Sequence, residues 1–339
     1  MSTPIPSATA TPPALLALCD ELQRARAEAR QIDPPSRRTG GLTLDDAYRV
    51  AAELRARRLA AGEQPRGRKI GFTNRQIWEE YQVWAPIWGT VYDSSLHLFD
   101  DRPAPATDAV PRREPLLDTA IDPTDPPGDE ADDTLPELAA AATHDTLDEQ
   151  LHAGVDIATS RAGLAGLCEP RIEPEIVFGL GRAPAAGMTP AELLACVDWL
   201  APGFELVHSL YPGWRFAAPD TVAAYGLHGA LHVGPRVSLP PGSVHRGRWQ
   251  HALENFGIEL RCNGEVMDRG HASHVLEGPL HALRHLVELL AIQPGQPALA
   301  AGEVVTTGTL TRALPVHPGQ RWSLRLRGIA LAGYSLGLA

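Results

Sequence analysis

The sequence is organised around one stretch, Cys168-Glu169-Pro170-Arg171-Ile172-Glu173-Pro174-Glu175-Ile176-Val177-Phe178. Its last three residues are apolar and of the types that favour strands, so the stretch predicts a β-strand that enters a core. Alternate side chains of a strand share one face, and Glu173 and Glu175 are therefore expected to point the same way.

Two carboxylates on a partly buried face repel each other, which leaves several outcomes open. One of them keeps its proton, a cation lies between them, or both face solvent or pair with arginines. Glu-x-Glu is too short a pattern to choose among these outcomes, so the rest of the chain has to decide.

Composition limits the class of protein. The 339 residues are 44% hydrophobic and 21% charged, enough for one large domain or two smaller ones. A net charge of -11 argues against a nucleic-acid partner. No apolar run approaches the roughly 18 residues of a membrane span, and residues 1–13 lack the features of a secretory signal. Four cysteines without metal-type spacing indicate a reducing environment, so we expect a cytoplasmic protein with no membrane partner.

The chain divides into an N-terminal part and a core. Residues 1–62 read as a tail and a small helical layer, with a helix from about Leu15 to Arg30. A second helix is capped by Thr43 and runs through Leu59. Residues 63–339 form the predicted core, interrupted at about 101–160 by an acidic, proline-rich insertion.

The insertion has too little apolar surface to offset the entropy of ordering it. Between residues 101 and 156 it holds about fifteen Asp and Glu against about three Arg. We predict a loop, with a short helix near residues 135–142. Two roles stay open for it, a passive insertion and an active-site lid.

The core is expected to alternate strands and helices, with no internal repeat. The Asn263-Gly264 pair is a hairpin signal. We expect helices at 189–200 and 280–290, and strands at 204–208, 227–233, 258–262, 265–268, 303–307, 321–326 and 329–335. This pattern predicts an α+β fold with a mixed, β-rich core and peripheral helices.

Three further features bear on function. Lys69 begins a short strand-like run in which Gly71 would let the backbone approach a ligand closely, although an isolated lysine is usually a surface group. Glu205 lies between apolar neighbours and needs a partner. The aromatic cluster is expected to pack internally or at a subunit interface, since no basic groove accompanies it; its members are Trp78, Tyr81, Trp84 and Trp88.

Four segments, in this order, resemble a known family. They are Lys69-Ile70-Gly71-Phe72-Thr73, Arg171 to Phe178, Phe204-Glu205-Leu206-Val207 and Thr306-Thr307-Gly308-Thr309-Leu310-Thr311. Together they resemble the 2-oxo-4-pentenoate hydratase and 4-oxalocrotonate decarboxylase branch of the fumarylacetoacetate hydrolase superfamily. The likeness runs from about residue 14 to the end, except for the insertion. It implies a fold like that of the fumarylacetoacetase C-terminal domain.

The resemblance also implies a metal site and its chemistry. Glu173, Glu175 and Glu205 would bind one Mg²⁺ or Mn²⁺, hard cations that prefer oxygen ligands. The metal would stabilise an enolate of a small 2-oxo acid substrate. Lys69 would hold the substrate carboxylate or move a proton, and we expect burial and a nearby cation to lower its pKa.

The remaining residues implied by the resemblance would contact substrate: Gly71, Thr309 and Thr311. Where the better-known hydratases carry an Ala-Asp-Asn run and serines, this chain reads Ala223-Ala224-Tyr225-Gly226-Leu227-His228, so the far end of the pocket is expected to differ. His208 and His228 are candidates for an additional acid or base, although a histidine beside a strand is more often structural. His271 and His274 lack a third ligand and are rejected as a zinc site.

The first functional hypothesis is a lyase that hydrates 2-hydroxypenta-2,4-dienoate to 4-hydroxy-2-oxopentanoate in aromatic catabolism. Its nearest alternative is a 4-oxalocrotonate decarboxylase that uses the same metal and enolate. An acylpyruvate-type C–C hydrolase would need a Glu/His pair to activate water, for which His144 is a poor candidate. A non-catalytic structural subunit would give no reason for three acids and a lysine at these positions. The aromatic cluster and the resemblance both suggest a homo-oligomer.

Overall fold

The computed structural model describes residues 11–75, 78–99, 158–240, 242, 246–293 and 295–339. Nearly all of the predicted acidic insertion lies outside these residues, as does His144. Residues 158–160, at the predicted end of the insertion, already belong to a strand that pairs with the chain's last strand. Among the described residues, no helix is both long and apolar enough to span a membrane.

Two sheets form the centre of the described structure, which confirms the predicted α+β class. The larger has nine strands, with the main path β2-β1-β11-β5-β6-β7-β3, while β12 pairs with β5 and β8 pairs with β6. These strands are β1 (Pro65–Gly71), β2 (Ile87–Tyr92), β3 (Leu96–Leu98), β5 (Arg171–Leu180), β6 (Val197–Val207), β7 (His228–Val233), β8 (Val237–Ser238), β11 (Val304–Thr306) and β12 (Leu314–Pro315).

The smaller sheet has the order β10-β9-β13-β14-β4. It packs on the larger sheet through aromatic rings: Phe204 of β6 stacks on Tyr334 of β14 with ring centroids 5.6 Å apart. Its strands are β4 (Ala158–Ala162), β9 (Gly257–Cys262), β10 (Glu265–His271), β13 (Arg321–Arg327) and β14 (Tyr334–Leu338).

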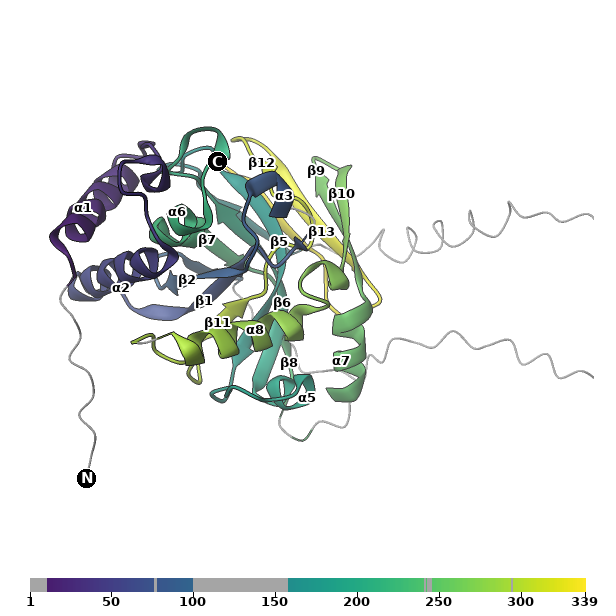
Figure 1. The fold of residues 1–339 in the computed structure, drawn as a ribbon. Helices are drawn as coiled ribbons and strands as arrows, with labels where there is room; N and C mark the ends of the chain where they lie inside the picture. The colour runs from purple at the N-terminus through teal and green to yellow at the C-terminus, as the bar shows by residue number, and fades with distance from the viewer. Residues whose placement is uncertain (1–10, 76–77, 100–157, 241, 243–245, 294) are drawn as a thin grey trace, which may run out of the picture.

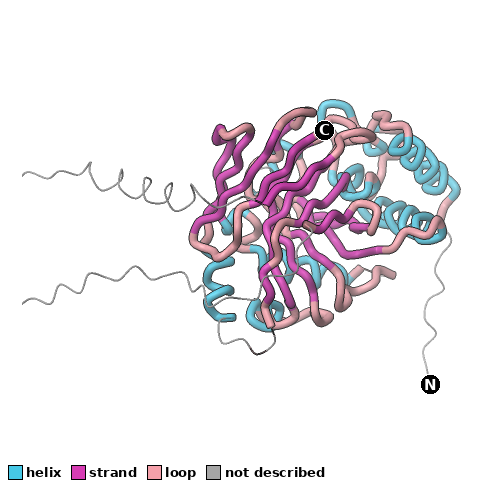
Figure 2. Tube along the Cα trace, turned by 180° about the vertical axis from the view of Figure 1, so that it is seen from behind, coloured by secondary structure: helices cyan, strands magenta, loops and turns pink. Residues whose placement is uncertain are grey.

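Helices lie at the margins of the sheets, as Figure 2 shows from behind. At one end, α1 and α2 pack together beside α6, and at the other end α5, α7 and α8 lie together (Figure 1). The helices are α1 (Pro13–Ala27), α2 (Leu44–Ala60), α3 (Trp78–Tyr81), α5 (Pro190–Leu194), α6 (Ala218–Ala223), α7 (Arg246–Asn255) and α8 (Pro279–Ile292), with short 3-10 turns at 35–37, 212–214, 225–227 and 272–274.

Local signals that fix a backbone conformation gave correct predictions. The Thr43 hydroxyl caps α2 by accepting a hydrogen bond from the Asp46 amide at 3.1 Å. Asn263 and Gly264 have φ of 51° and 91° and join β9 to β10 in the predicted hairpin. In the aromatic cluster, Trp88 is buried and stacks on Tyr48, whereas the Trp84 side chain is 60% exposed.

Three predictions of element boundaries were wrong. The helix predicted at 189–200 ends at Leu194, because residues 197–207 gain strand pairing with β5 and β8 that outweighs local helix propensity. The strand predicted at 329–335 is β14, which begins at Tyr334, where pairing with Leu324 of β13 becomes available. Lys69 lies near the end of β1 and not at its start.

Candidate metal and substrate site

The three predicted carboxylates converge on two neighbouring strands. Glu173 of β5 lies directly opposite Glu205 of β6, and Glu175 follows two residues along β5 on the same face. Each offers a ligand oxygen, and these oxygens all lie within 4.8 Å of one another. Glu175 and Glu205 are buried, and Glu173 is half-buried.

A gap beside β5 makes room for this cluster. β12 pairs with β5 at residues 171–172 and β11 pairs at 177–179, so none of the described strands flanks Glu173 to Ile176 on that side. The segment from Thr307 to Leu310 fills the gap through its own polar groups. The Leu310 amide donates to the carbonyl of Pro174 at 3.0 Å, and the Thr307 hydroxyl donates to the carbonyl of Ile176 at 3.0 Å. Proline fits at position 174, where a ladder hydrogen bond is not needed.

Gly308 is the residue of this segment that contacts the carboxylates. Its amide donates to Glu175 Oε2 at 2.7 Å, and its φ is 92°. A Cβ at this position would lie 1.8 Å from Thr73 Oγ1, so only glycine lets the amide reach the carboxylate.

Thr309 and Thr311 are both buried in the same turn. The Thr309 hydroxyl donates to the Thr311 carbonyl at 2.9 Å, and the Thr311 hydroxyl donates to the Arg312 carbonyl at 3.1 Å. Both hydroxyls therefore stabilise the turn itself. The predicted contact of these threonines with substrate stays a prediction.

Lys69 reaches the carboxylates from β1. Its Nζ lies 3.2 Å from Glu205 Oε2 and donates to the carbonyl of Gly226 at 3.1 Å. A Cβ on Gly71 would lie 3.3 Å from this Nζ, so the glycine leaves space for the ammonium group. The lysine and the three acids that the sequence singled out are thus brought together.

His228 lies behind Glu205. Its Nδ1 is 2.7 Å from Glu205 Oε1, and its Nε2 is 2.9 Å from the Ser95 hydroxyl. His208, the other candidate, instead contacts Arg26, with His208 Nε2 3.0 Å from Arg26 Nη1, and burial lowers the pKa of His208 to about 3.

Burial and mutual repulsion shift the pKa values of the three carboxyl groups. Burial and the Glu205 carboxylate raise the pKa of Glu173 to about 7, against the effect of Lys69. Burial, Glu205 and Glu173 raise the pKa of Glu175 well above its usual range. Burial also raises the pKa of Glu205, but Lys69 and the hydrogen bond with His228 outweigh it, so this pKa is lowered.

The predicted lowering of the Lys69 pKa was wrong for the protein without a cation. Burial does lower the pKa of Lys69, but the carboxylates of Glu205, Glu173 and Glu175 together outweigh burial and raise it. The sequence prediction counted burial and a cation but omitted the sum of three anions.

The cluster fits a divalent cation on chemical grounds. Three carboxylates face one lysine, so two negative charges remain to be balanced once all three carboxyl groups are ionised. Glu175 Oε1 is buried and accepts no hydrogen bond from any residue that the structure describes. An all-oxygen set of carboxylates suits a hard divalent ion that retains further positions for water or substrate.

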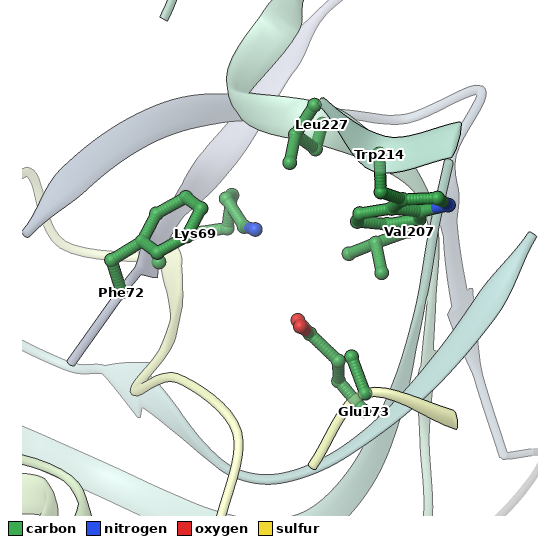
Figure 3. Close-up of a pocket in the computed structure, with 8 residues that line it drawn as sticks. Lys69, Phe72, Glu173, Val207, Trp214 and Leu227 are labelled. Atoms are coloured by element: carbon green, nitrogen blue, oxygen red, sulfur yellow. The ribbon is translucent and has the colours of Figure 1, made fainter. Parts of the chain in front are cut away.

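A pocket opens next to the carboxylates, and Lys69, Gly71 and Glu173 belong to its lining. Figure 3 shows the Lys69 ammonium and the Glu173 carboxylate pointing into the same space. The rest of the lining, which we call the apolar wall, consists of Phe72, Val207, Trp214, Leu227 and Ala313.

Sequence reasoning missed most of the apolar wall. It did place Leu227 in the segment where the far end of the pocket was expected to differ. The other wall residues come from loops and strand ends, where no periodicity marks a side chain as pocket-lining. Arg171, on the same face of β5 as Glu173, lies beside this wall, with its guanidinium carbon 4.4 Å from the centroid of the Trp214 ring.

The sequence relates this chain to known proteins over most of its length. Residues 151–332 match the family model for the fumarylacetoacetate hydrolase C-terminal domain. The chain is 25% identical over 309 residues to a 2-hydroxyhexa-2,4-dienoate hydratase of Comamonas testosteroni, covering 91% of this chain and 92% of that protein. It is 31% identical over 156 residues to a 4-oxalocrotonate decarboxylase of a Pseudomonas species, covering 46% of this chain and 56% of that protein.

The fold has a solved counterpart. The structure of 4-oxalocrotonate decarboxylase from Pseudomonas putida G7, complexed with magnesium and adipate, matches with a TM-score of 0.71. The two chains are 22% identical, and the match covers 98% of this chain and all of that one. At this identity the likeness establishes the fold alone.

Proposed function

We propose that this chain, which belongs to the fumarylacetoacetate hydrolase family, is a divalent-metal-dependent hydro-lyase that acts on a small 2-hydroxy-2,4-dienoic acid. The observation that carries the proposal is the cluster of Glu173, Glu175 and Glu205 beside Lys69 at the edge of a pocket. The favoured reaction is hydration of 2-hydroxypenta-2,4-dienoate to 4-hydroxy-2-oxopentanoate.

Glu173, Glu175 and Glu205 would hold Mg²⁺ or Mn²⁺. When bound, the ion supplies Lewis-acid stabilisation of the negative charge that develops on the 2-oxygen as the dienol loses its proton. Gly308 fixes Glu175 by donating to one oxygen, and His228 and Lys69 fix the two oxygens of Glu205. Glu175 and Glu205 are therefore held in place before any ligand arrives.

Lys69 is the proposed proton carrier and carboxylate anchor. Its ammonium reaches the same space as Glu173, and the Gly226 carbonyl orients it. In the overall reaction the 2-hydroxyl proton is lost, C5 and C3 each gain a proton, and water adds its hydroxyl to C4. Lys69 Nζ is positioned to hold the substrate carboxylate or to pass a proton between the 2-oxygen and carbon.

The apolar wall supports a substrate whose far end is uncharged. Phe72, Val207, Trp214, Leu227 and Ala313 give a hydrocarbon tail a surface to contact and offer no side-chain donor to a second carboxylate apart from the indole of Trp214, which donates to the Glu169 carbonyl. A monoacid therefore suits this wall better than a diacid does.

One observation favours a second candidate, decarboxylation of a 4-oxalocrotonate-like diacid. Arg171 places a guanidinium beside Trp214, where it donates to the Ala313 carbonyl at 3.4 Å, so a positive charge that would attract a distal carboxylate lies next to the apolar wall. The two reactions would share the cation, Lys69 and the enolate, and would differ in the bond that is made or broken afterwards.

A C–C hydrolase has less support. His228 and Glu205 do form a Glu/His pair, but both ring nitrogens of His228 already have partners. His228 is also not among the residues that line the pocket beside Lys69 and Glu173. A purely structural subunit gives no reason for burying three acids against one lysine.

A substrate panel tests the proposal. The purified protein is incubated with Mg²⁺ or Mn²⁺ and either 2-hydroxypenta-2,4-dienoate or a 2-oxo-3-hexenedioate. We expect the dienol absorbance to disappear with formation of 4-hydroxy-2-oxopentanoate and without CO₂. Release of CO₂ from the diacid with an inert monoacid would replace the hydratase by the decarboxylase, and inactivity toward both would overturn the lyase proposal.

A further inference from the structure

A series of three hydrogen-bonded side chains begins at Glu205 and leads away from the pocket, and all three are buried. Glu205, His228 and Ser95 come from β6, from β7 and from the turn before β3, and none of them is more than 5% exposed. Because these side chains are buried, water cannot substitute for a hydrogen bond that is lost between them. Each of these hydrogen bonds therefore matters for the structure.

The chemistry of the three side chains determines which group donates each hydrogen bond. The carboxylate of Glu205 can only accept, so His228 Nδ1, 2.7 Å from Oε1, must carry a proton and donate it. In the neutral imidazole Nε2 then has a lone pair, which accepts from the Ser95 hydroxyl at 2.9 Å; the Tyr92 carbonyl, the other acceptor near this hydroxyl, is farther away at 3.2 Å. The Tyr92 amide donates to the same hydroxyl oxygen at 3.2 Å and orients it.

The backbone around His228 is fixed as well. Arg26 of α1 donates to the His228 carbonyl at 2.9 Å, and the Ser95 carbonyl accepts from the Leu231 amide at 2.8 Å. The imidazole is therefore held at both ring nitrogens and through its main chain. It is positioned to determine where Glu205 Oε1 points.

The other oxygen of Glu205 faces the site. Oε2 lies 3.2 Å from Lys69 Nζ, while Oε1 is turned away to His228. A carboxylate without the His228 donor could rotate, and Oε1 would be left buried without a partner. The arrangement resembles the hydrogen bonds that orient ligands from behind in metal sites.

We infer that His228, fixed by Ser95, is a positioning residue that orients Glu205 toward a divalent cation. This inference rests on the proposed function, because it assigns His228 a role through a proposed metal ligand. His228 does not touch substrate in this role.

The test is Mn²⁺ binding to the purified full chain, measured by calorimetry or by loss of the free-ion paramagnetic resonance signal. His228→Phe keeps a ring but removes the donor, and we expect its Kd for Mn²⁺ to rise about 10- to 100-fold. His228→Asn places an amide N–H near the position of Nδ1, and we expect it to bind Mn²⁺ almost as tightly as the parent.

A matched control comes from the same strand. His232 is also buried in β7 and stacks on His97 with ring centroids 4.5 Å apart, away from the carboxylates. His232→Phe should leave the Kd unchanged. If His228→Phe does not fold, Ser95→Ala serves in its place, and we expect a smaller but measurable rise in Kd.

The outcomes separate this inference from the proposed function. Parent-like affinity in folded His228→Phe, or equal losses in the Phe and Asn variants, would overturn the positioning role. An unchanged Kd in Ser95→Ala would show that Ser95 takes no part in positioning Glu205. A parent protein that fails to bind Mn²⁺ at all would instead count against the proposed metal-dependent function.

Discussion

The charged groups of the site and the apolar wall of the pocket are built in different ways. The charged side, by which we mean Lys69 and the three acids Glu173, Glu175 and Glu205, has its acids on strands whose register places Glu173 opposite Glu205. The apolar wall takes Phe72, Trp214 and Leu227 from turns, and each of these residues has a positive φ, of 55°, 58° and 62°.

Bulky residues rarely adopt this left-handed conformation, which costs roughly 1–2 kcal/mol for each residue. Such strain is concentrated at functional sites, where surrounding structure maintains it. The chemical groups are thus held by sheet pairing, whereas the surface that meets the substrate tail is held by strained turns. We expect changes on the charged side to abolish the reaction and changes in the wall to alter the choice of substrate.

The largest effect is expected for Glu205→Gln. The change removes one proposed ligand charge and disturbs the contacts with Lys69 and His228. Because a bound cation contributes several kcal/mol to the transition state, kcat should fall about 10³- to 10⁴-fold. Steady-state kinetics at saturating Mg²⁺ check this. Glu265→Gln, an exposed acid on β10, is the control, and comparable losses in both variants would contradict a specific role for Glu205.

The second-largest effect on turnover is expected for Lys69→Met. Loss of a positioned proton carrier reduces turnover about a hundredfold or more. Removing the ammonium also removes a cation that competes for the carboxylates, so affinity for Mn²⁺ should be retained or increased. Comparison of kcat with the Mn²⁺ Kd in one variant distinguishes the two effects. A variant that loses metal binding in parallel with turnover would make Lys69 part of the cation site only.

Stability of the cation-free protein should decrease as pH rises. Burial, together with Glu205, raises the pKa of Glu173 from 4.5 to about 7, so the folded state keeps a proton that the unfolded state releases. The folded state binds more protons between these values, and stability therefore falls by up to about 1.4 kcal/mol per pH unit across that window.

Thermal unfolding between pH 4.5 and 7.5, with chelator and with excess Mg²⁺, measures this dependence. Bound Mg²⁺ favours the ionised carboxylates and should remove most of the decline. A melting temperature in chelator that rises steadily through the window would show that the carboxylates are stabilised without a cation.

Arg171→Met tests the boundary between the two sides. Arg171 shares the face of Glu173 but lies against Trp214 of the wall. If the substrate tail is uncharged, kcat/KM for 2-hydroxypenta-2,4-dienoate should change only a few-fold, whereas any turnover of the diacid should drop about 10- to 100-fold with the loss of a charge-assisted hydrogen bond. Equal losses for both substrates would place Arg171 in the common machinery.

Leu227→Ala should have the smallest effect. Alanine and leucine are strained alike at φ of 62°, so the change acts mainly on the shape of the wall. A dienoate with one additional methylene should gain about tenfold in relative kcat/KM over the five-carbon substrate. An unchanged preference would mean that Leu227 does not meet the tail.

The same contrast explains what the sequence could predict. Glu-x-Glu in an apolar run marks a strand with both acids on one face, and a third acid between apolar residues marks a second strand. These signals are local, and the structure brings Glu173, Glu175 and Glu205 together as expected. The family and its fold, expected from four short segments, are confirmed by the family match and the solved counterpart.

The apolar wall and the support behind Glu205 depend on long-range geometry. Trp214 faces the pocket because its turn has an unusual φ, and His228 meets Ser95 across 133 positions of sequence. The helix predicted to continue to Leu200 failed for the same reason, since β6 forms only where β5 is available to pair with it. Mg²⁺ versus Mn²⁺, the homo-oligomer and the roles of Thr309 and Thr311 stay predictions.

Titration of the parent and of Glu175→Gln with Mn²⁺ tests the carboxylate site most directly. The introduced amide would keep an oxygen to accept from the Gly308 amide, so the variant changes charge with little change in shape. We predict one Mn²⁺ per parent chain and at least a tenfold weaker affinity in the variant. Equal affinities in the two proteins would contradict a cation site formed by Glu173, Glu175 and Glu205.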